Sequence, residues 1–154
     1  MTAISFTVAG VPAPQGSKTR TRFGMREDNP NVKPWRQAVA ADATDAMHGR
    51  EPVTGPVELA ARFYFARPKH HFRSGRHAGE LKPTAPVHCT TKPDTDKLLR
   101  AIGDALSGIV VRDDAQIVRV TAEKLYGRPR AVIAVAPIQP TADVLPQTQL
   151  AATA

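Results

Sequence analysis

The sequence predicts a single α/β (α+β) domain with about four strands and two main helices. Three observations support this fold class: four segments have the apolar pattern of strands, two have helical spacing, and 154 residues form one ordinary domain. We place the domain at residues 1–138. Residues 139–154, which are rich in Gln, Pro, Thr and Ala, are interpreted as a disordered tail.

Hydrophobic periodicity assigns the first half of the chain to two strands and one helix. Apolar residues alternate with polar or small residues in the strand segments, whereas they recur every three or four residues in the helical segment. Gly49 stands where the helix should end. The predicted elements are a strand over about residues 3–11, a helix over 34–47 and a strand over 56–66.

A second helix and two further strands are predicted in the other half. From Asp96 onward, leucine, isoleucine and alanine gather on one side of a helical wheel and charged residues on the other. Residues 116–126 alternate as a half-buried strand does, and residues 131–137 are apolar on both faces, as a central strand is. The residues of the alternating strand that we expect to point inward are Val118, Val120 and Ala122.

Two segments have no apolar period and are rich in basic residues. Residues 14–29 are interpreted as a flexible basic loop, which either faces an anion or is simply solvated. Residues 67–92 form a long irregular segment, and segments of this length are usually functional or disordered. Its histidines are interpreted as loop residues near phosphate, with zinc binding as a minor alternative because their spacing is irregular. These histidines are His70, His71, His77 and His88.

The charge of the chain indicates an anionic partner. The formal net charge is +7, and residues 1–93 carry 14 Lys+Arg against 7 Asp+Glu, whereas residues 94–154 carry 7 of each. Such a surface suits a nucleic-acid-binding protein better than one that contacts anionic membranes. There is no apolar run of the ~20 residues that a membrane-spanning helix needs and no signal-peptide pattern. With its single Cys89, we expect a cytoplasmic protein without membrane contact.

Four aspartates form an acidic cluster within this basic chain. If the segment around Asp94 and Asp96 is extended, both carboxylates point to the same side, with Cα atoms roughly 6.6 Å apart. Asp113 and Asp114 follow after one helix and a short connection, so the fold can bring them opposite the first pair. Oxygen ligands of this kind suit Mg²⁺, or Mn²⁺, in a site that hydrolyses phosphodiesters.

A structural explanation of the same acids stays open. Asp94 would then cap the helix, and Asp113 and Asp114 would be turn residues before a strand. A cap accounts for one aspartate but leaves the clustering of the others unexplained. Arg100 follows Asp96 by four residues, so it either pairs with that carboxylate or reaches a phosphate oxygen beside the metal.

Together these motifs resemble the RusA family of Holliday-junction resolvases. The resemblance depends on D-x-D, a Leu-rich helix containing D-A-L, and D-D-A-Q-I before a strand, with an N-terminal strand and a G-x-P-x-P basic loop upstream. It covers about residues 4–137. The resemblance implies a small mixed β-sheet with two helices packed on it, a homodimer, magnesium-dependent endonuclease activity and paired symmetric nicks across a four-way DNA junction. Such families are common in phage and prophage, which implies the cytoplasm of a bacterium or an infected host.

Matched position by position, Asp94, Asp96 and Asp114 correspond to the metal-binding carboxylates of the family, and Asp113 is the neighbouring acid. Two positions depart from the family pattern. Members often have Asn directly after the second acid and Lys four residues after it, where this chain has Lys97 and Arg100. Arginine keeps the charge but lacks the compact ammonium geometry. The residues expected to be catalytic are Asp94, Asp96, Asp114 and Arg100.

The leading hypothesis is a structure-selective DNA endonuclease that resolves four-way junctions in recombination and repair. One alternative is a non-catalytic nucleic-acid-binding protein that keeps the fold, and another is a metal-dependent enzyme acting on a small phosphate ester. The basic first half of the chain favours nucleic acid over a small ester. The residues expected to contact DNA are Lys18, Arg20, Arg22, Lys69, Arg73, Arg76 and Lys97.

Overall fold

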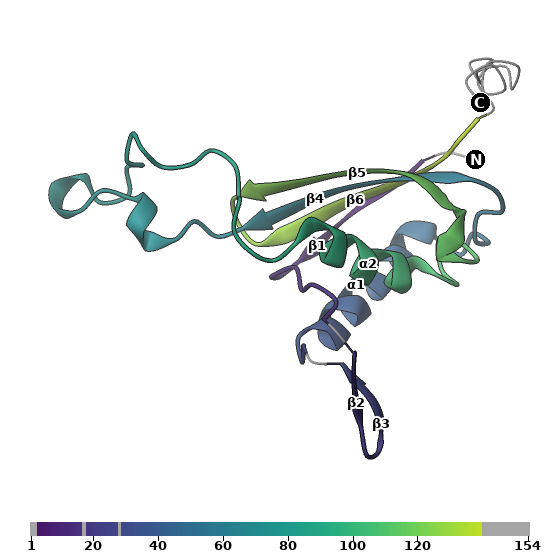
Figure 1. Cartoon of the computed structure of the whole chain (residues 1–154). Coiled ribbons are helices and arrows are strands. Elements are labelled where there is room, and N and C mark those ends of the chain that lie inside the picture. The colour runs from purple at the N-terminus through teal and green to yellow at the C-terminus, as the bar shows by residue number, and fades with distance from the viewer. Residues whose placement is uncertain (1–2, 17, 28, 140–154) are drawn as a thin grey trace, which may run out of the picture.

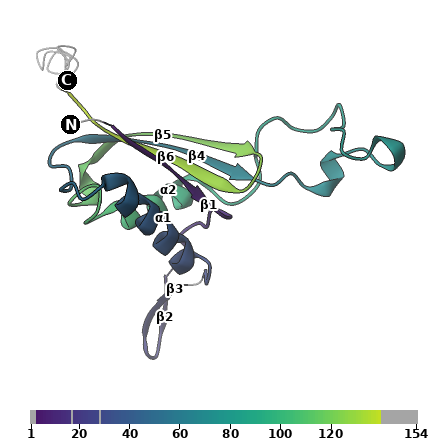
Figure 2. The same ribbon diagram turned by 180° about the vertical axis from the view of Figure 1, so that it is seen from behind.

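The structure, a computed structural model, describes residues 3–16, 18–27 and 29–139. Its main strands and helices are β1 (Ile4–Ala9), α1 (Val32–Met47), β4 (Val57–Phe65), α2 (Thr95–Leu106), β5 (Ile117–Tyr126) and β6 (Arg130–Pro137). The strands form one mixed sheet in the order β1-β6-β4-β5, and both helices cover the same face of it (Figures 1 and 2). The predicted mixed sheet of four strands with two packed helices is confirmed.

The core lies between the helices and the three strands β1, β6 and β4. β6 pairs antiparallel with β1 on one side and with β4 on the other, so its predicted central position is confirmed. The apolar side of α2 is buried as its periodicity predicted, and Phe63, Ile102 and Ile133 are fully buried between the layers. This core fixes α2 against the sheet, and α2 carries most of the candidate site.

The edge strand β5 differs from its prediction. Val118 is 62% exposed and Val120 is 46% exposed, so the expectation that they would be buried is wrong. Pairing with β4 is parallel, and its register shifts between Val57 and Glu58, so that Val118 is passed over as the extra residue of a bulge. Val120 does pair with the buried Leu59, but β5 is bordered by a strand on one side only.

Two excursions leave the body of the domain. β2 (Lys18–Thr21) and β3 (Gly24–Glu27) form an antiparallel hairpin that projects on the helix side of the sheet (Figure 1). We expected an irregular loop here, and that expectation was wrong. No described side chain of the hairpin is buried, so the sequence has no apolar alternation from which its strands could be predicted. Residues 67–92 extend from the end of β4 as an arm, and the prediction that this segment is largely irregular is confirmed.

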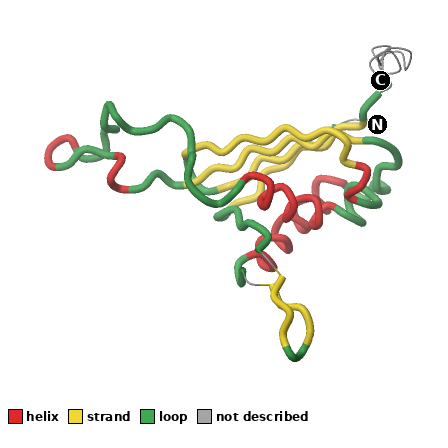
Figure 3. Tube along the Cα trace, in the orientation of Figure 1, coloured by secondary structure: helices red, strands yellow, loops and turns green. Residues whose placement is uncertain are grey.

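The arm contains two short 3-10 turns, η1 (Lys69–His71) and η2 (Gly75–His77), and one isolated antiparallel bridge between Phe72 and Leu81, within otherwise irregular chain (Figure 3). Within the described residues, no helix has the length and apolar character needed to cross a bilayer. The predicted disordered tail, residues 139–154, lies outside the described residues apart from Gln139.

Candidate functional site

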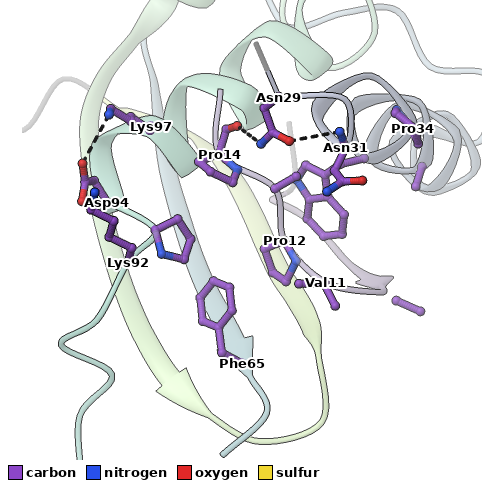
Figure 4. A pocket seen from close by; sticks show the side chains of 15 residues that line it. Val11, Pro12, Pro14, Asn29, Asn31, Pro34, Phe65, Lys92, Asp94 and Lys97 are labelled. Carbon is purple, nitrogen blue, oxygen red and sulfur yellow. Dashed lines mark hydrogen bonds and ion pairs between the residues drawn. The ribbon is translucent and has the colours of Figure 1, made fainter. Parts of the chain in front are cut away.

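The first two candidate acids lie where α2 begins. The helix starts at Thr95, so Asp94 is the N-cap residue and Asp96 lies in the first turn; the extended segment that we expected ends before Asp96. The Asp94 side chain makes no capping hydrogen bond, and its Oδ2 lies 3.4 Å from Lys97 Nζ (Figure 4). The N-terminal end of a helix dipole stabilises negative charge, so both carboxylates occupy a position that suits anions.

The segment that carries Asp94 is fixed by a lysine from β5. Lys124 Nζ donates hydrogen bonds to Thr91 O at 2.6 Å and to Pro93 O at 2.8 Å. Lys124 pairs with Phe63 and therefore shares the helix-covered face of the sheet. We did not single out Lys124 from the sequence; the available signal was a charged residue at an inward position of an alternating strand.

The second pair of acids begins η3 (Asp114–Gln116), and its two members differ. Asp113 Oδ1 accepts a hydrogen bond from Ala115 N at 2.8 Å, so this carboxylate caps the turn. This agrees with the structural explanation of the acids, in which Asp113 is a turn residue before a strand. Asp114 is exposed, and its side chain makes no hydrogen bond or ion pair within the described residues. Of the two, Asp114 has the carboxylate with no partner among the described residues.

Gln116 holds this acidic turn against the rest of the domain. Its Oε1 accepts hydrogen bonds from Arg112 N at 2.8 Å and Asp113 N at 3.0 Å. Its Nε2 donates to Val53 O and to Gly55 O, both at 2.9 Å, in the segment that leads into β4. One side chain thus ties the D-D-A-Q motif to a distant loop, a role that sequence alone could not assign because both carbonyl partners are backbone atoms.

Helix α2 connects the two acidic segments. Asp96, Arg100 and Gly103 are spaced by four and three residues, so they lie on one face of the helix. A Cβ atom placed on Gly103 would lie 3.7 Å from Asp114 Cβ. Asp114 therefore lies beside the same face as Asp96, separated from it by two turns or about 10 Å of helix rise. Arg100 stands between them along the helix and forms no ion pair with described residues.

The donor set fits a hard cation by ligand type. Asp94, Asp96 and Asp114 offer exposed carboxylate oxygens, and Mg²⁺ usually takes one or two carboxylates and completes its shell with water and phosphate oxygens. No three His, Cys, Asp or Glu side chains of the described residues are arranged to hold a metal ion together. The site therefore fits Mg²⁺ by the type of its ligands and by their position near the same helix, without a preformed set of three ligands in the described part of the chain.

Comparison with known proteins agrees with the motifs on α2 and η3. The family model "Endodeoxyribonuclease RusA" matches residues 9–136, a span that contains all four aspartates. The chain belongs to the RusA endodeoxyribonuclease family. It is also 34% identical, over 136 residues, to the protein YqaN of Bacillus subtilis (strain 168), whose description is "Uncharacterized protein". That alignment covers 82% of this chain and 89% of YqaN, and the predicted family resemblance is confirmed.

In this RusA-family chain, the predicted DNA contacts lie on both excursions, except Lys97, which lies in α2. On the hairpin, Arg20 and Arg22 are exposed, and the Arg22 guanidinium lies 5.3 Å from the ring centroid of Phe23, which is 91% exposed at the tip. Lys18 lies in β2, and its side chain falls outside the description. On the arm, Lys69 and Arg76 are exposed, and Arg73 Nη1 pairs with Glu80 at 3.0 Å.

The root of the arm is packed onto Tyr126 of β5. The Arg67 guanidinium lies 4.4 Å from the centre of the Tyr126 ring and donates to Pro86 O at 2.8 Å. The His71 ring meets the same tyrosine edge-on at 5.4 Å. Burial lowers the pKa of His71 from 6.5, and the neighbouring His70 and Arg67 lower it further. His71 is thus a neutral packing group at neutral pH.

Proposed function

We propose that this RusA-family protein is a structure-selective endonuclease that resolves four-way DNA junctions by paired, Mg²⁺-dependent cuts. The observation that carries the proposal is that three exposed aspartates lie at the start of α2 and in η3 beside it, in a domain from which two basic excursions, the hairpin and the arm, project (Figure 1). Basic flanks attract the phosphate backbone, and carboxylates with a divalent cation are a common means of cutting it.

The proposed roles follow from position and charge. Asp94, Asp96 and Asp114 supply oxygen ligands, and Arg100, between the two acidic segments, contacts an oxygen of the cut phosphate. A bound Mg²⁺ supplies an activated water and neutralises charge on that phosphate. Asp113 takes a supporting role, because its carboxylate already caps η3. Lys97 contacts DNA beside Asp94, with which it is paired in the free protein.

The two excursions are proposed to hold duplex arms of the junction. The hairpin leaves the helix side of the domain and the arm leaves the end of the sheet, so the two project in different directions from the body that carries α2 (Figures 1 and 2). The proposed backbone contacts are Lys18, Arg20, Arg22, Lys69, Arg73 and Arg76.

A homodimer is the proposed assembly. One domain carries one set of acids, whereas resolution of a junction needs cuts at two symmetric positions, and a two-fold dimer provides both. The sheet face opposite the helices offers a surface for it, since small apolar residues such as Ala60 and Ala134 lie there beside an ion pair between Arg62 and Glu123 at 2.8 Å.

The competing function is binding of branched DNA without cleavage. Two observations favour it: the Asp113 carboxylate caps η3, and the Asp94 carboxylate pairs with Lys97. In this reading the acids shape the protein, and the basic excursions alone provide its activity.

Incubation of the purified chain with a synthetic four-way junction, with and without Mg²⁺, separates these functions. We expect symmetric cuts only with Mg²⁺. Asp96→Asn should abolish cleavage while binding is kept or tightened, because a ligand and a charge that repels DNA are both lost. Asp45→Asn is the matched control, since it removes an exposed carboxylate from the far end of α1. Binding without cleavage by the unaltered chain establishes the competing function, and full activity of Asp96→Asn contradicts the site.

A further inference from the structure

An open pocket of about 860 Å³ lies directly beside Asp94. It is formed where the loop after β1, the start of α1, the end of β4 and the start of α2 meet (Figure 4). Its walls include Pro12, Trp35, Phe65 and Pro93, and Asn31 lies at its rim. The pocket therefore opens next to the position at which we propose that DNA is cut.

The walls of this pocket suit a flat ring. Trp35 is 5% exposed and belongs to the core, so its position is fixed, while Phe65 is half-buried. Aromatic and proline rings offer planar apolar surfaces, and nucleobases stack on aromatic rings largely regardless of base identity. Lys92 and Lys97 also line the pocket and supply positive charge for the phosphates on either side of such a base.

Asn31 is a polar residue of this pocket whose side-chain amide is available to a ligand. It occupies the N-cap position of α1, yet its side chain makes no capping bond and no other hydrogen bond within the described residues. Its neighbour Asn29, by contrast, is engaged: Nδ2 donates to Pro14 O at 2.8 Å, and Oδ1 accepts from Asn31 N at 3.0 Å. The Asn31 amide thus offers one donor group and one acceptor to a ligand in the pocket.

The described end of the chain lies far from this pocket. Ile138 N donates to Pro56 O, immediately before the start of β4, whereas Phe65 is the last residue of that strand. Both termini of the ribbon emerge at the end of the sheet away from the arm (Figure 1). The charge of the rim instead favours a polyanion, and the adjoining acids are those proposed to cut one.

We propose that this pocket binds one unstacked nucleobase of the DNA strand next to the cut phosphodiester, and that Asn31 contacts the edge of that base. The inference rests on the proposed function and adds a residue that determines its sequence preference. Bases at a branch point have lost part of their stacking, so they are extruded at lower cost than bases within a duplex. An amide can donate to and accept from a base edge, which distinguishes one base from another.

The test uses the full chain and a set of four-way junctions in which single nucleotides flanking each cleavage position are made abasic, one position at a time. For the unaltered protein we expect one position at which loss of the base slows cleavage about ten-fold, because stacking of one base contributes on that order. At this position the four natural bases should also be cut at different rates. Asn31→Ala should cut all four alike and should still cut the abasic junction.

Gln37→Ala is the matched control, since it removes another exposed amide of α1 that does not line this pocket. Two results overturn the pocket proposal while the proposed function stands. One is that Asn31→Ala protein keeps the base preference of the unaltered protein; the other is that an active protein cuts every abasic junction at the same rate. A protein that cuts no intact junction overturns the proposed function, and the pocket proposal falls with it. A change in sedimented mass on Asn31→Ala or Phe65→Ala shows that a second copy covers the pocket, which also overturns it.

Discussion

Replacement of Gln116 by alanine should loosen the acidic turn and lower stability. The side chain makes four hydrogen bonds to backbone groups of Arg112, Asp113, Val53 and Gly55. Each such bond contributes about 0.5–1.5 kcal/mol net. Arg112, Asp113 and Gly55 are exposed, so water can replace part of what is lost at their backbone groups. The expected cost is therefore about 2–3 kcal/mol, near the low end of the sum.

Urea unfolding followed by the fluorescence of the single Trp35, which is buried in α1, measures this cost. Gln37→Ala serves as control, because that side chain is exposed and makes no hydrogen bond in the described part of the chain. Gln116→Glu tests the two donated hydrogen bonds separately. A carboxylate still accepts from the two N–H groups, but it has no donor for the carbonyls of Val53 and Gly55.

Cleavage supplies the second measurement. Asp114 lies two residues before Gln116 in the same turn, so Gln116→Ala should reduce junction cleavage more than junction binding. If Gln116→Ala lowers the free energy of unfolding by less than about 0.5 kcal/mol, as Gln37→Ala does, the Gln116 hydrogen bonds do not hold the acidic turn. Unchanged cleavage by a destabilised protein would show instead that Asp114 is held by its contact with α2 alone.

Four further outcomes are expected. Alanine at Lys18, Arg20 and Arg22 together should flatten the dependence of log K on log salt by about 0.9 for each lost phosphate contact; an unchanged slope places the hairpin in solvent. Sedimentation should give about twice the 16.6 kDa chain mass, and a cruciform plasmid should be linearised directly instead of accumulating as nicked circle. Since the pKa of His71 is lowered from 6.5, the unfolded chain binds its proton more readily, so stability should fall as the pH drops below 6.5; His71→Gln should flatten this fall in urea titrations. Gly103→Ala should raise the free energy of unfolding by roughly 0.5–1 kcal/mol, since the added Cβ meets Asp114 at an ordinary contact distance; a decrease contradicts the packing described.

Periodicity predicted the elements that bury one face. The helix predicted from residue 34 begins at Val32, and the strands predicted over residues 56–66 and 116–126 are β4 and β5 with ends shifted by one residue or none. These segments could be predicted because burial forces apolar residues into the period of the backbone. The hairpin could not be predicted in this way, because none of its described side chains is buried and its strands are held by backbone hydrogen bonds.

The candidate site likewise contains residues that could be predicted from the sequence and contacts that could not. The aspartates could be singled out because four acids in a basic chain are unusual, and the family match includes them. The partners of Lys124 and Gln116 could not be identified, because these side chains bind backbone carbonyls of segments distant in sequence, and a carbonyl leaves no mark on residue type. The difference in role between Asp113 and Asp114 likewise depends on the local turn that places Ala115 N beside one carboxylate.

The region of β5 supports both acidic segments, and the strand leaves part of its own apolar surface exposed. Gln116 directly precedes β5 and Lys124 lies near its end, and each holds one acidic segment through backbone carbonyls. The inner face of this edge strand meets polar chain near Lys124, whereas Ile117 and Ala122 of the same face pack against the apolar core. The alternation in residues 116–126 correctly predicted that Val120 points to the helix-covered face of the sheet. Whether a residue on that face is buried depends on what packs against it. Val120 points to the same face as the buried Leu59 with which it pairs, but β5 is bordered by a strand on one side only, and Val120 stays 46% exposed.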